Sequence, residues 1–278
     1  MKNKTYFHIN EISWKSFTEK EWSQLRWKEI LNKKRGGTKE FIFGYAELDS
    51  GGKFPLQTHP QAETDFILSG KAIVRLGKRK VELESHSAVY FPSKAPHSIE
   101  SIGEEPLCYI YTYACEKLGN NIEMELASEK MADQVDILNN PKTRWAVAEE
   151  FEPWFFWEPS KGSKGISMRK LFNFEYGNCR EMAVGTFMLP SGIHYTLHYH
   201  DQPEIYYTLS GRGIIYVGNS KIEAFPGIGI YIGERIVHGA DVLGPDPLHV
   251  YWVYGTETMG QNFNWTPVED IYTETKKI

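Results

Sequence analysis

The sequence contains few cysteines and no long hydrophobic run. Its three cysteines, Cys108, Cys115 and Cys179, are an odd number with no close pair of recognised meaning. We therefore expect reduced, buried thiols of a cytoplasmic protein rather than a disulfide framework. No stretch of about 18 apolar residues occurs, which argues against a membrane-spanning helix. The N-terminal residues lack the apolar segment of a signal peptide, so we expect a cytoplasmic location and no membrane partner.

An excess of positive charge is also missing. The 278 residues include 31 Lys and Arg against 36 Asp and Glu, for a formal net charge of −5. Because nucleic-acid binding relies on clustered basic residues, we expect no nucleic-acid partner. Hydrophobic residues make up 41% and aromatic residues 14% of the chain, which is enough for a large core and excludes general disorder. A chain of this length suggests two domains.

An internal repeat decides the domain organisation. The segment from Gly51 matches the segment from Gly192, 141 residues later, without a gap. The matched pairs are Gly51 with Gly192, His59 with His200, Glu63 with Glu204, Leu68 with Leu209, Ser69 with Ser210, Gly70 with Gly211, Tyr90 with Tyr231 and His97 with His238. We therefore predict two copies of one unit, at 1–118 and 151–278. The charged residues 119–150 lack strand alternation, and we interpret them as a linker with a short helix near 124–131.

Each copy has the pattern of an all-β fold. Residues 71–83 and 211–225 alternate between apolar and polar side chains, each with a glycine-containing turn in the middle. Short strands separated by Gly, Pro, Asn and Ser are typical of a small barrel or jelly roll, which leaves few exposed sheet edges. Helical periodicity is visible only near 18–31 and in the linker. We expect two β-barrels that pack against each other.

Residue types that bind metals gather in the second copy. His198 and His200 are two positions apart and therefore share a face of a β-strand. Glu204 follows after turn residues, and His238 can join them from a neighbouring strand. Three imidazoles and one carboxylate inside a barrel predict a site for one divalent transition metal, Fe, Mn, Zn or Ni, with open coordination positions. The isolated histidines are interpreted as ordinary structural or surface residues: His8, His86, His194 and His249.

The spacing of these ligands resembles a known signature. The stretch from Gly192 to Gly211 reads Gly-x5-His-x-His-x3-Glu-x6-Gly and is similar to the first signature of the cupin superfamily. The second signature persists between Gly227 and His238, with Gly233 and Arg235 where Pro and Gly are common. Because both copies carry the pattern, the chain resembles bicupins, which implies two tandem jelly-roll cupin barrels. Cupins host many activities, so the fold alone selects none of them.

The first copy departs from this signature at one ligand position. Gln57 replaces the first histidine, whereas His59, Glu63 and His97 are retained. A neutral amide oxygen is a weaker ligand for a transition metal than imidazole. This copy therefore either holds a second metal loosely or is a structural barrel, and we favour the structural interpretation. An aspartate stands where the second copy has Tyr206, which indicates that the two copies do not share one chemistry.

The second copy also resembles the cupin-type dimethylsulfoniopropionate lyases of marine bacteria. The resemblance rests on the runs from Leu197 to Tyr206, from Gly211 to Ile215 and from Val250 to Trp252. It implies a metal held by the three histidines and the glutamate, with Tyr206 as the catalytic base. A second important tyrosine of those lyases aligns with Trp265. The lyases are single cupins, whereas this chain is duplicated.

These features predict a metal-dependent lyase that cleaves a small β-substituted carboxylate by β-elimination. Aromatic faces would steady a cationic leaving group; Tyr195 and Trp252 are candidates, whereas Tyr207 and Tyr251 are expected to pack in the core. Two alternatives stay open on the same residues. One is an iron-dependent dioxygenase or a sugar-type isomerase, and the other is a non-catalytic bicupin that binds a small molecule. The chain could also form a homodimer, and the sequence leaves this possibility open.

Overall fold

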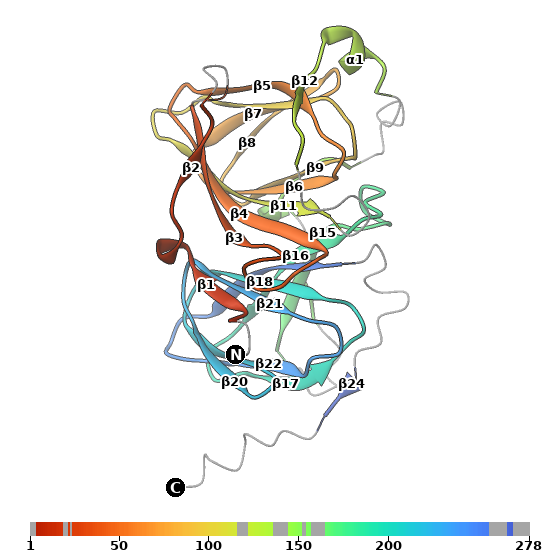
Figure 1. Ribbon diagram of the computed structural model, residues 1–278. Helices are drawn as coiled ribbons and strands as arrows, with labels where there is room; N and C mark the ends of the chain where they lie inside the picture. The colour runs from red at the N-terminus through yellow and green to blue at the C-terminus, as the bar shows by residue number, and fades with distance from the viewer. Residues whose placement is uncertain are drawn as a thin grey trace, which may run out of the picture.

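Antiparallel β-strands make up most of the protein. The computed structural model describes residues 4–18, 22, 24–115, 122–135, 144–151, 154–156, 165–255 and 266–268. Within them the short helices are η1 (Ile9–Glu11), α1 (Glu129–Asp133) and η4 (Glu149–Phe151). Two sheets of seven strands and two of five form two barrels, each from one larger and one smaller sheet (Figure 1). The predicted all-β fold of two tandem barrels is confirmed.

The first barrel follows the first repeat. Its strands are β2 (Lys15–Ser16), β3 (Leu25–Leu31), β4 (Phe41–Leu48), β5 (Lys53–Thr58), β6 (Glu63–Ser69), β7 (Lys71–Leu76), β8 (Arg79–Glu84), β9 (Ser87–Phe91), β10 (His97–Ser101), β11 (Leu107–Ala114), β12 (Glu125–Leu126) and β13 (Ala146–Ala148). The larger sheet has the order β13-β9-β6-β11-β4-β3-β2, and the smaller sheet has the order β12-β5-β10-β7-β8.

The second barrel repeats this topology strand for strand. Its strands are β1 (Tyr6–His8), β14 (Phe155–Phe156), β15 (Ser167–Phe172), β16 (Ala183–Leu189), β17 (His194–Tyr199), β18 (Glu204–Ser210), β19 (Gly213–Val217), β20 (Ser220–Ala224), β21 (Ile228–Ile232), β22 (His238–Val242), β23 (Leu248–Tyr254) and β24 (Thr266–Pro267). The sheet orders are β1-β21-β18-β23-β16-β15-β14 and β20-β19-β22-β17-β24. The repeat seen in the sequence is therefore also a repeat of strand pairing.

Each barrel is completed by one strand from outside its predicted unit. Strand β1 precedes the first barrel but pairs with β21 of the second, and β13 precedes the second barrel but pairs with β9 of the first. Figure 1 shows β1 beside β21. Separating the barrels would break both ladders. The division at 1–118, 119–150 and 151–278 stays a prediction. β1 lies in the first predicted unit but joins the second barrel, and β13 lies in the predicted linker but joins the first.

Three buried clusters account for the core. One fills the first barrel and includes Phe54, and another fills the second barrel and includes Tyr206. The third lies between the two larger sheets, where Phe66 of the first barrel packs with Tyr207 and Tyr251 of the second. Because apolar burial is the main stabilising term in folding, this shared cluster holds the barrels together, as expected from the sequence.

The helix predictions need correction. The periodicity at 18–31 predicts a helix, but β3 (Leu25–Leu31) is a strand that pairs with β4. Long-range pairing outweighs local periodicity here. In the linker, α1 begins at Glu129 because Ser128 caps it, accepting a hydrogen bond from the Met131 N–H at 3.3 Å. Residues 125–126, expected to be helical, form β12 instead.

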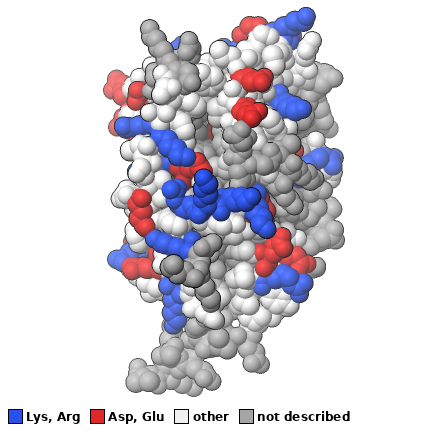
Figure 2. All heavy atoms as spheres, in the orientation of Figure 1, with Lys and Arg blue, Asp and Glu red and all other residues white. Residues whose placement is uncertain are grey.

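Surface charges of both signs are interspersed. On the face in Figure 2, Lys and Arg form a band across the middle that is bordered by Asp and Glu. Basic and acidic side chains form ion pairs, such as Lys15 Nζ with Glu29 Oε2 at 2.6 Å. Exposed pairs of this kind contribute little to stability, about 0–1 kcal/mol each.

The three thiols are free. Cys115 and Cys179 are buried as expected, whereas Cys108 is partly exposed. Burial raises the pKa of Cys115 to about 12, which keeps this thiol protonated and unreactive. In the described parts of the chain, no helix combines the length and the apolar character needed to cross a bilayer.

Candidate metal centres

The four candidate ligands of the second barrel lie on neighbouring strand ends. His198 on β17 stands directly opposite His238, the first residue of β22. His200 follows the last residue of β17, and Glu204 begins β18 after the turn at 201–203. All four side chains are at most 1% exposed. Strand parity and the turn therefore bring the predicted set together inside the barrel.

Backbone carbonyls orient the three imidazoles. The Nδ1 atom of each histidine lies 2.8 Å from the carbonyl oxygen of a residue two positions away in the chain. An Nδ1–H that donates there leaves the Nε2 lone pair for a metal. Ring nitrogens of His198, His200 and His238 lie within 4.8 Å of one another. The Glu204 Oε2 atom lies 3.2 Å from Nε2 of both His200 and His238. This donor set fits a first-row divalent metal.

Burial and hydrogen bonding set the charges of this cluster. Burial lowers the pKa of His198 well below its ordinary value, so its imidazole is neutral. Burial raises the pKa of Glu204, but its contacts with the His200 and His238 rings outweigh that effect, and the net pKa is lowered. Neutral imidazole and ionised carboxylate are the forms in which these side chains bind metals.

Tyr206 faces the interior of the second barrel beside this cluster. Its side chain lies on the same face of β18 as Glu204 and packs in the core of the second barrel. The Tyr207 side chain lies on the other face and packs between the barrels, as strand parity predicts. Burial raises the pKa of Tyr206 well above its ordinary value, and the negative charge of Glu204 adds to the shift. The Tyr206 side chain is therefore a neutral phenol, not a phenolate, in the metal-free protein.

Other aromatic residues fill the rest of the second barrel. Tyr195 and Trp252 are at most 1% exposed, and the Tyr195 ring centroid lies 4.7 Å from that of His198. The Trp252 ring packs edge-on against Tyr254 at 5.1 Å. Both residues proposed from the sequence thus line the barrel interior. The third, Trp265, lies outside the described residues.

The first barrel brings together a second cluster. The Glu63 Oε2 atom lies 3.0 Å from His59 Nε2 and 3.2 Å from His97 Nε2. Because His97 Nδ1 donates to a backbone carbonyl at 2.7 Å, its Nε2 accepts a hydrogen bond from the Gln57 amide at 2.6 Å. The amide thus occupies the direction in which a metal would bind this imidazole. Ligand-type clusters therefore exist in both barrels, not only in the second.

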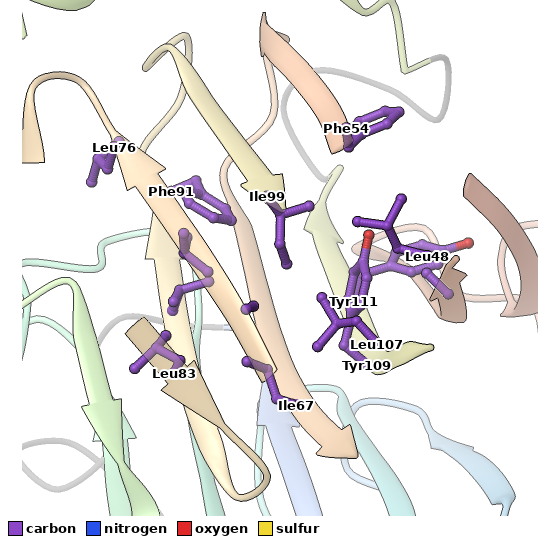
Figure 3. Packing of buried hydrophobic residues seen from close by; sticks show 14 of the residues in the cluster. Leu48, Phe54, Ile67, Leu76, Leu83, Phe91, Ile99, Leu107, Tyr109 and Tyr111 are labelled. Atoms are coloured by element: carbon purple, nitrogen blue, oxygen red, sulfur yellow. The ribbon is translucent and has the colours of Figure 1, made fainter. Parts of the chain in front are cut away.

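The first barrel also encloses a cavity of about 480 Å³ that reaches Gln57, Glu63 and His97. Figure 3 shows Phe54, Ile99 and Tyr111 pointing from three strands into this interior. Much of the wall is aromatic and is formed by Phe17, Trp22, Trp27, Phe54, Tyr109 and Tyr111. Sequence reasoning missed this cavity, because neither residue spacing nor strand parity reports how completely side chains fill a barrel.

Two residues of the cavity wall are smaller than their counterparts in the second barrel. Asp65 stands where the second barrel has Tyr206, and Tyr111 stands where it has Trp252. Burial and the neighbouring Glu63 charge raise the pKa of Asp65 well above its ordinary value, which favours the protonated carboxyl. The cavity walls therefore combine aromatic faces with carboxyl groups.

A third cluster was missed from the sequence. His86, Glu149 and His249 offer ligand atoms that all lie within 4.8 Å of one another. Two of these residues were interpreted as ordinary histidines, and the third lies in the predicted linker. No motif or spacing relates them, because they belong to three separate elements.

Comparison with family models places the chain. The model described as "Cupin domain" matches residues 44–113 and 185–254, together half of the sequence. The chain belongs to the Cupin domain family. It is a bicupin, and the two matches fall on the two barrels, in agreement with the signature between Gly192 and Gly211.

Solved bicupin structures share the fold. An oxalate decarboxylase of Bacillus subtilis has a TM-score of 0.73 at 15% identity, covering 96% of this chain and 80% of that one. The oxalate decarboxylase of Lactobacillus farciminis, in its formate complex, has a TM-score of 0.75 at 13% identity, covering 96% and 89%. At such identities the likeness concerns the fold. An uncharacterised protein of Methanocaldococcus jannaschii is 38% identical over 58 residues, which span 20% of this chain and less than half, 46%, of that protein.

Proposed function

We propose that this bicupin is a metal-dependent lyase that acts on a small β-substituted carboxylate in its second barrel. His198, His200, Glu204 and His238 would hold the metal. The observation that carries the proposal is the orientation of the three imidazoles, each with Nδ1 held 2.8 Å from a backbone carbonyl. A hydrogen bond from the ring nitrogen that does not bind the metal fixes the tautomer and the ring direction of a metal-binding histidine.

Tyr206 is the proposed base. When bound, a divalent metal withdraws charge from a substrate carboxylate and acidifies the hydrogen on the adjacent carbon. A nearby cation also favours the phenolate form of tyrosine, which opposes the effect of burial on Tyr206. The phenolate accepts the proton, the C–H electron pair forms the carbon–carbon double bond, and the bond to the leaving group breaks. A sulfonium group leaves as a neutral thioether and needs no acid.

The substrate class rests on two lines of support. The resemblance of the second copy to dimethylsulfoniopropionate lyases suggests a β-sulfonium carboxylate, and Tyr195 and Trp252 supply aromatic faces near the cluster for its cationic group. The oxalate decarboxylases that share the fold act, by name, on another small carboxylate.

Anaerobic turnover tests the proposal. Metal-loaded protein is offered dimethylsulfoniopropionate, other β-substituted carboxylates and oxalate, and release of thioether, unsaturated acid or carbon dioxide is followed. Elimination without oxygen is the expected result. Turnover that requires oxygen would identify an iron dioxygenase, and an isomerised product would identify an isomerase; either outcome contradicts the lyase. Binding without turnover of any compound would leave a binding protein.

The cavity of the first barrel favours a second candidate function. We propose that it binds a small molecule through an apolar or cationic group, because aromatic faces and the Glu63 carboxylate attract cations. Lys15 is the one Lys or Arg among the lining residues. Its charge is already paired with Glu29 at 2.6 Å, so it repels a bound cation less. Trp22 and Trp27 report occupancy by fluorescence. Choline is expected to change their emission at lower concentration than its uncharged analogue 3,3-dimethylbutan-1-ol or oxalate. Equal responses to all three would contradict cation selection.

A further inference from the structure

The cluster of His86, Glu149 and His249 lies where three parts of the chain meet. His86 occupies the turn between β8 and β9 of the first barrel, Glu149 begins η4, and His249 lies on β23 of the second barrel. His86 Nδ1 donates to Glu149 Oε2 at 2.9 Å, and His249 Nε2 donates to Glu149 Oε1 at 3.0 Å. The two imidazole rings are parallel within 6°. One carboxylate thus lies between two imidazoles.

The cluster is buried on one side and open on the other. Glu149 is 2% exposed, whereas the side chain of His86 is 53% exposed. Thr186 Oγ1 donates to Glu149 Oε1 at 2.6 Å, and Arg169 Nη1 lies 3.8 Å from the same oxygen. These contacts orient the carboxylate through Oε1 and leave Oε2 directed at His86. An ion from solvent could therefore reach the ligand atoms from the His86 side.

The backbone at His86 argues for a role of its side chain. Its φ is +64°, in the left-handed region that favours glycine. The repeat places Gly227 at the equivalent position of the second barrel, where φ is +94°. Holding a non-glycine residue in this region costs of order 1 kcal/mol. The first barrel thus carries histidine in a turn whose geometry is satisfied better by glycine.

The cluster also breaks the repeat at its other two positions. Ala148 pairs with Ser87 as His8 pairs with Ile228, so the counterpart of Glu149 is Ile9. The counterpart of His249 is Cys108, and the second copy therefore lacks this combination. The set is independent of the cupin signature, whose ligands lie inside the barrels. Its geometry therefore does not follow from the duplication.

We propose that His86, Glu149 and His249 form a third metal site, one that binds Zn²⁺ or a similar divalent ion and links the two barrels. Two imidazoles, one carboxylate and a water molecule complete a tetrahedral zinc sphere, in which neighbouring ligand atoms lie about 3.4 Å apart at bond lengths of about 2.0–2.1 Å. The present nitrogen–oxygen distances of 2.9 and 3.0 Å run to the two different oxygens of Glu149. One ligand atom from each residue lies within 4.8 Å of the other two, so small side-chain rotations bring all three to one ion. Each imidazole then carries its proton on its other ring nitrogen.

Zinc content of the full chain tests the site. Parent and variant proteins are loaded with Zn²⁺, freed of excess by gel filtration and analysed for bound metal. His86→Gly is the informative variant, because the second barrel carries glycine in the same turn and the fold should tolerate it. His194→Ala is the matched control, since His194 pairs with Asp241 at 2.7 Å outside any of the three clusters. We expect His86→Gly to lose about one equivalent of zinc and His194→Ala to lose none.

A second measurement isolates the site from the two barrel centres. In a His59→Ala/His200→Ala background, Co²⁺ should still bind at one equivalent and give the visible absorption of a tetrahedral site. Adding His86→Gly should abolish that spectrum. Equal metal content in the parent and in His86→Gly, or an unchanged cobalt spectrum, would show a hydrogen-bonded His–Glu–His bridge only and overturn the proposal. Neither result depends on turnover, so the proposed lyase stands or fails separately.

Discussion

Tyr206→Phe separates catalysis from packing in the second barrel. The ring of Tyr206 is 1% exposed and packs edge-on against Phe187 at 5.1 Å. Phenylalanine keeps that ring and leaves no large cavity. The variant loses the hydroxyl beside Glu204, and the loss of one buried hydrogen bond costs about 1 kcal/mol of folding free energy. Glu204 keeps its contacts with His200 and His238 at 3.2 Å, so metal content should be unchanged.

The expected loss of activity is much larger than the loss of stability. Removing a positioned proton-transfer group lowers the rate by about 10²–10⁴-fold, which raises the activation free energy by about 3–5 kcal/mol. The assay compares kcat of metal-loaded parent and Tyr206→Phe on the substrate that the parent turns over. Thermal melting and elemental analysis are run on the same samples.

Tyr254→Phe is the matched control. Tyr254 is equally buried, its pKa is raised by burial and by Glu204, and its ring lies 4.9 Å from that of His200. It should lose far less activity than Tyr206→Phe, because it is not the proposed base. A Tyr206→Phe protein as active as the parent would refute the base assignment. Equal losses in both variants would show that the hydroxyls only orient Glu204.

Four further outcomes follow from the two barrels. His200→Ala should lower bound metal more than His59→Ala, because the Gln57 amide already satisfies an imidazole of the first cluster; equal losses by elemental analysis would show two full centres. Asp65→Tyr should fill the cavity as in the second barrel and abolish the choline-induced change in tryptophan fluorescence; a retained response would place binding elsewhere. Phe66→Ala should destabilise the chain by about 3–5 kcal/mol in urea unfolding, since this ring is fully buried between the barrels, and a much smaller loss would mean that the shared core contributes little. Proteolysis within 119–150, followed by light scattering, should release no separate halves and also reports whether the chain forms a homodimer; freely separating halves would contradict the packed pair of barrels.

Local backbone geometry makes much of the second centre predictable. In a strand, alternate residues share a face, so residue spacing alone places His198 with His200 and separates Tyr206 from Tyr207. The same reasoning fails at 18–31, where apolar spacing suits a helix but β4 supplies a pairing partner for Leu25–Leu31. Spacing describes one segment, whereas strand pairing depends on what lies beside it.

The sequence by itself determined the duplication, the strand-rich barrels and the ligand types of the cupin signature, because repeat spacing and side-chain period are properties of the local chain. Only the tertiary structure decided which strands cross between the barrels, that the first barrel keeps a cavity, and that His86, Glu149 and His249 converge. Free volume and convergence depend on how side chains from distant segments pack, and no spacing along a single sequence records that packing.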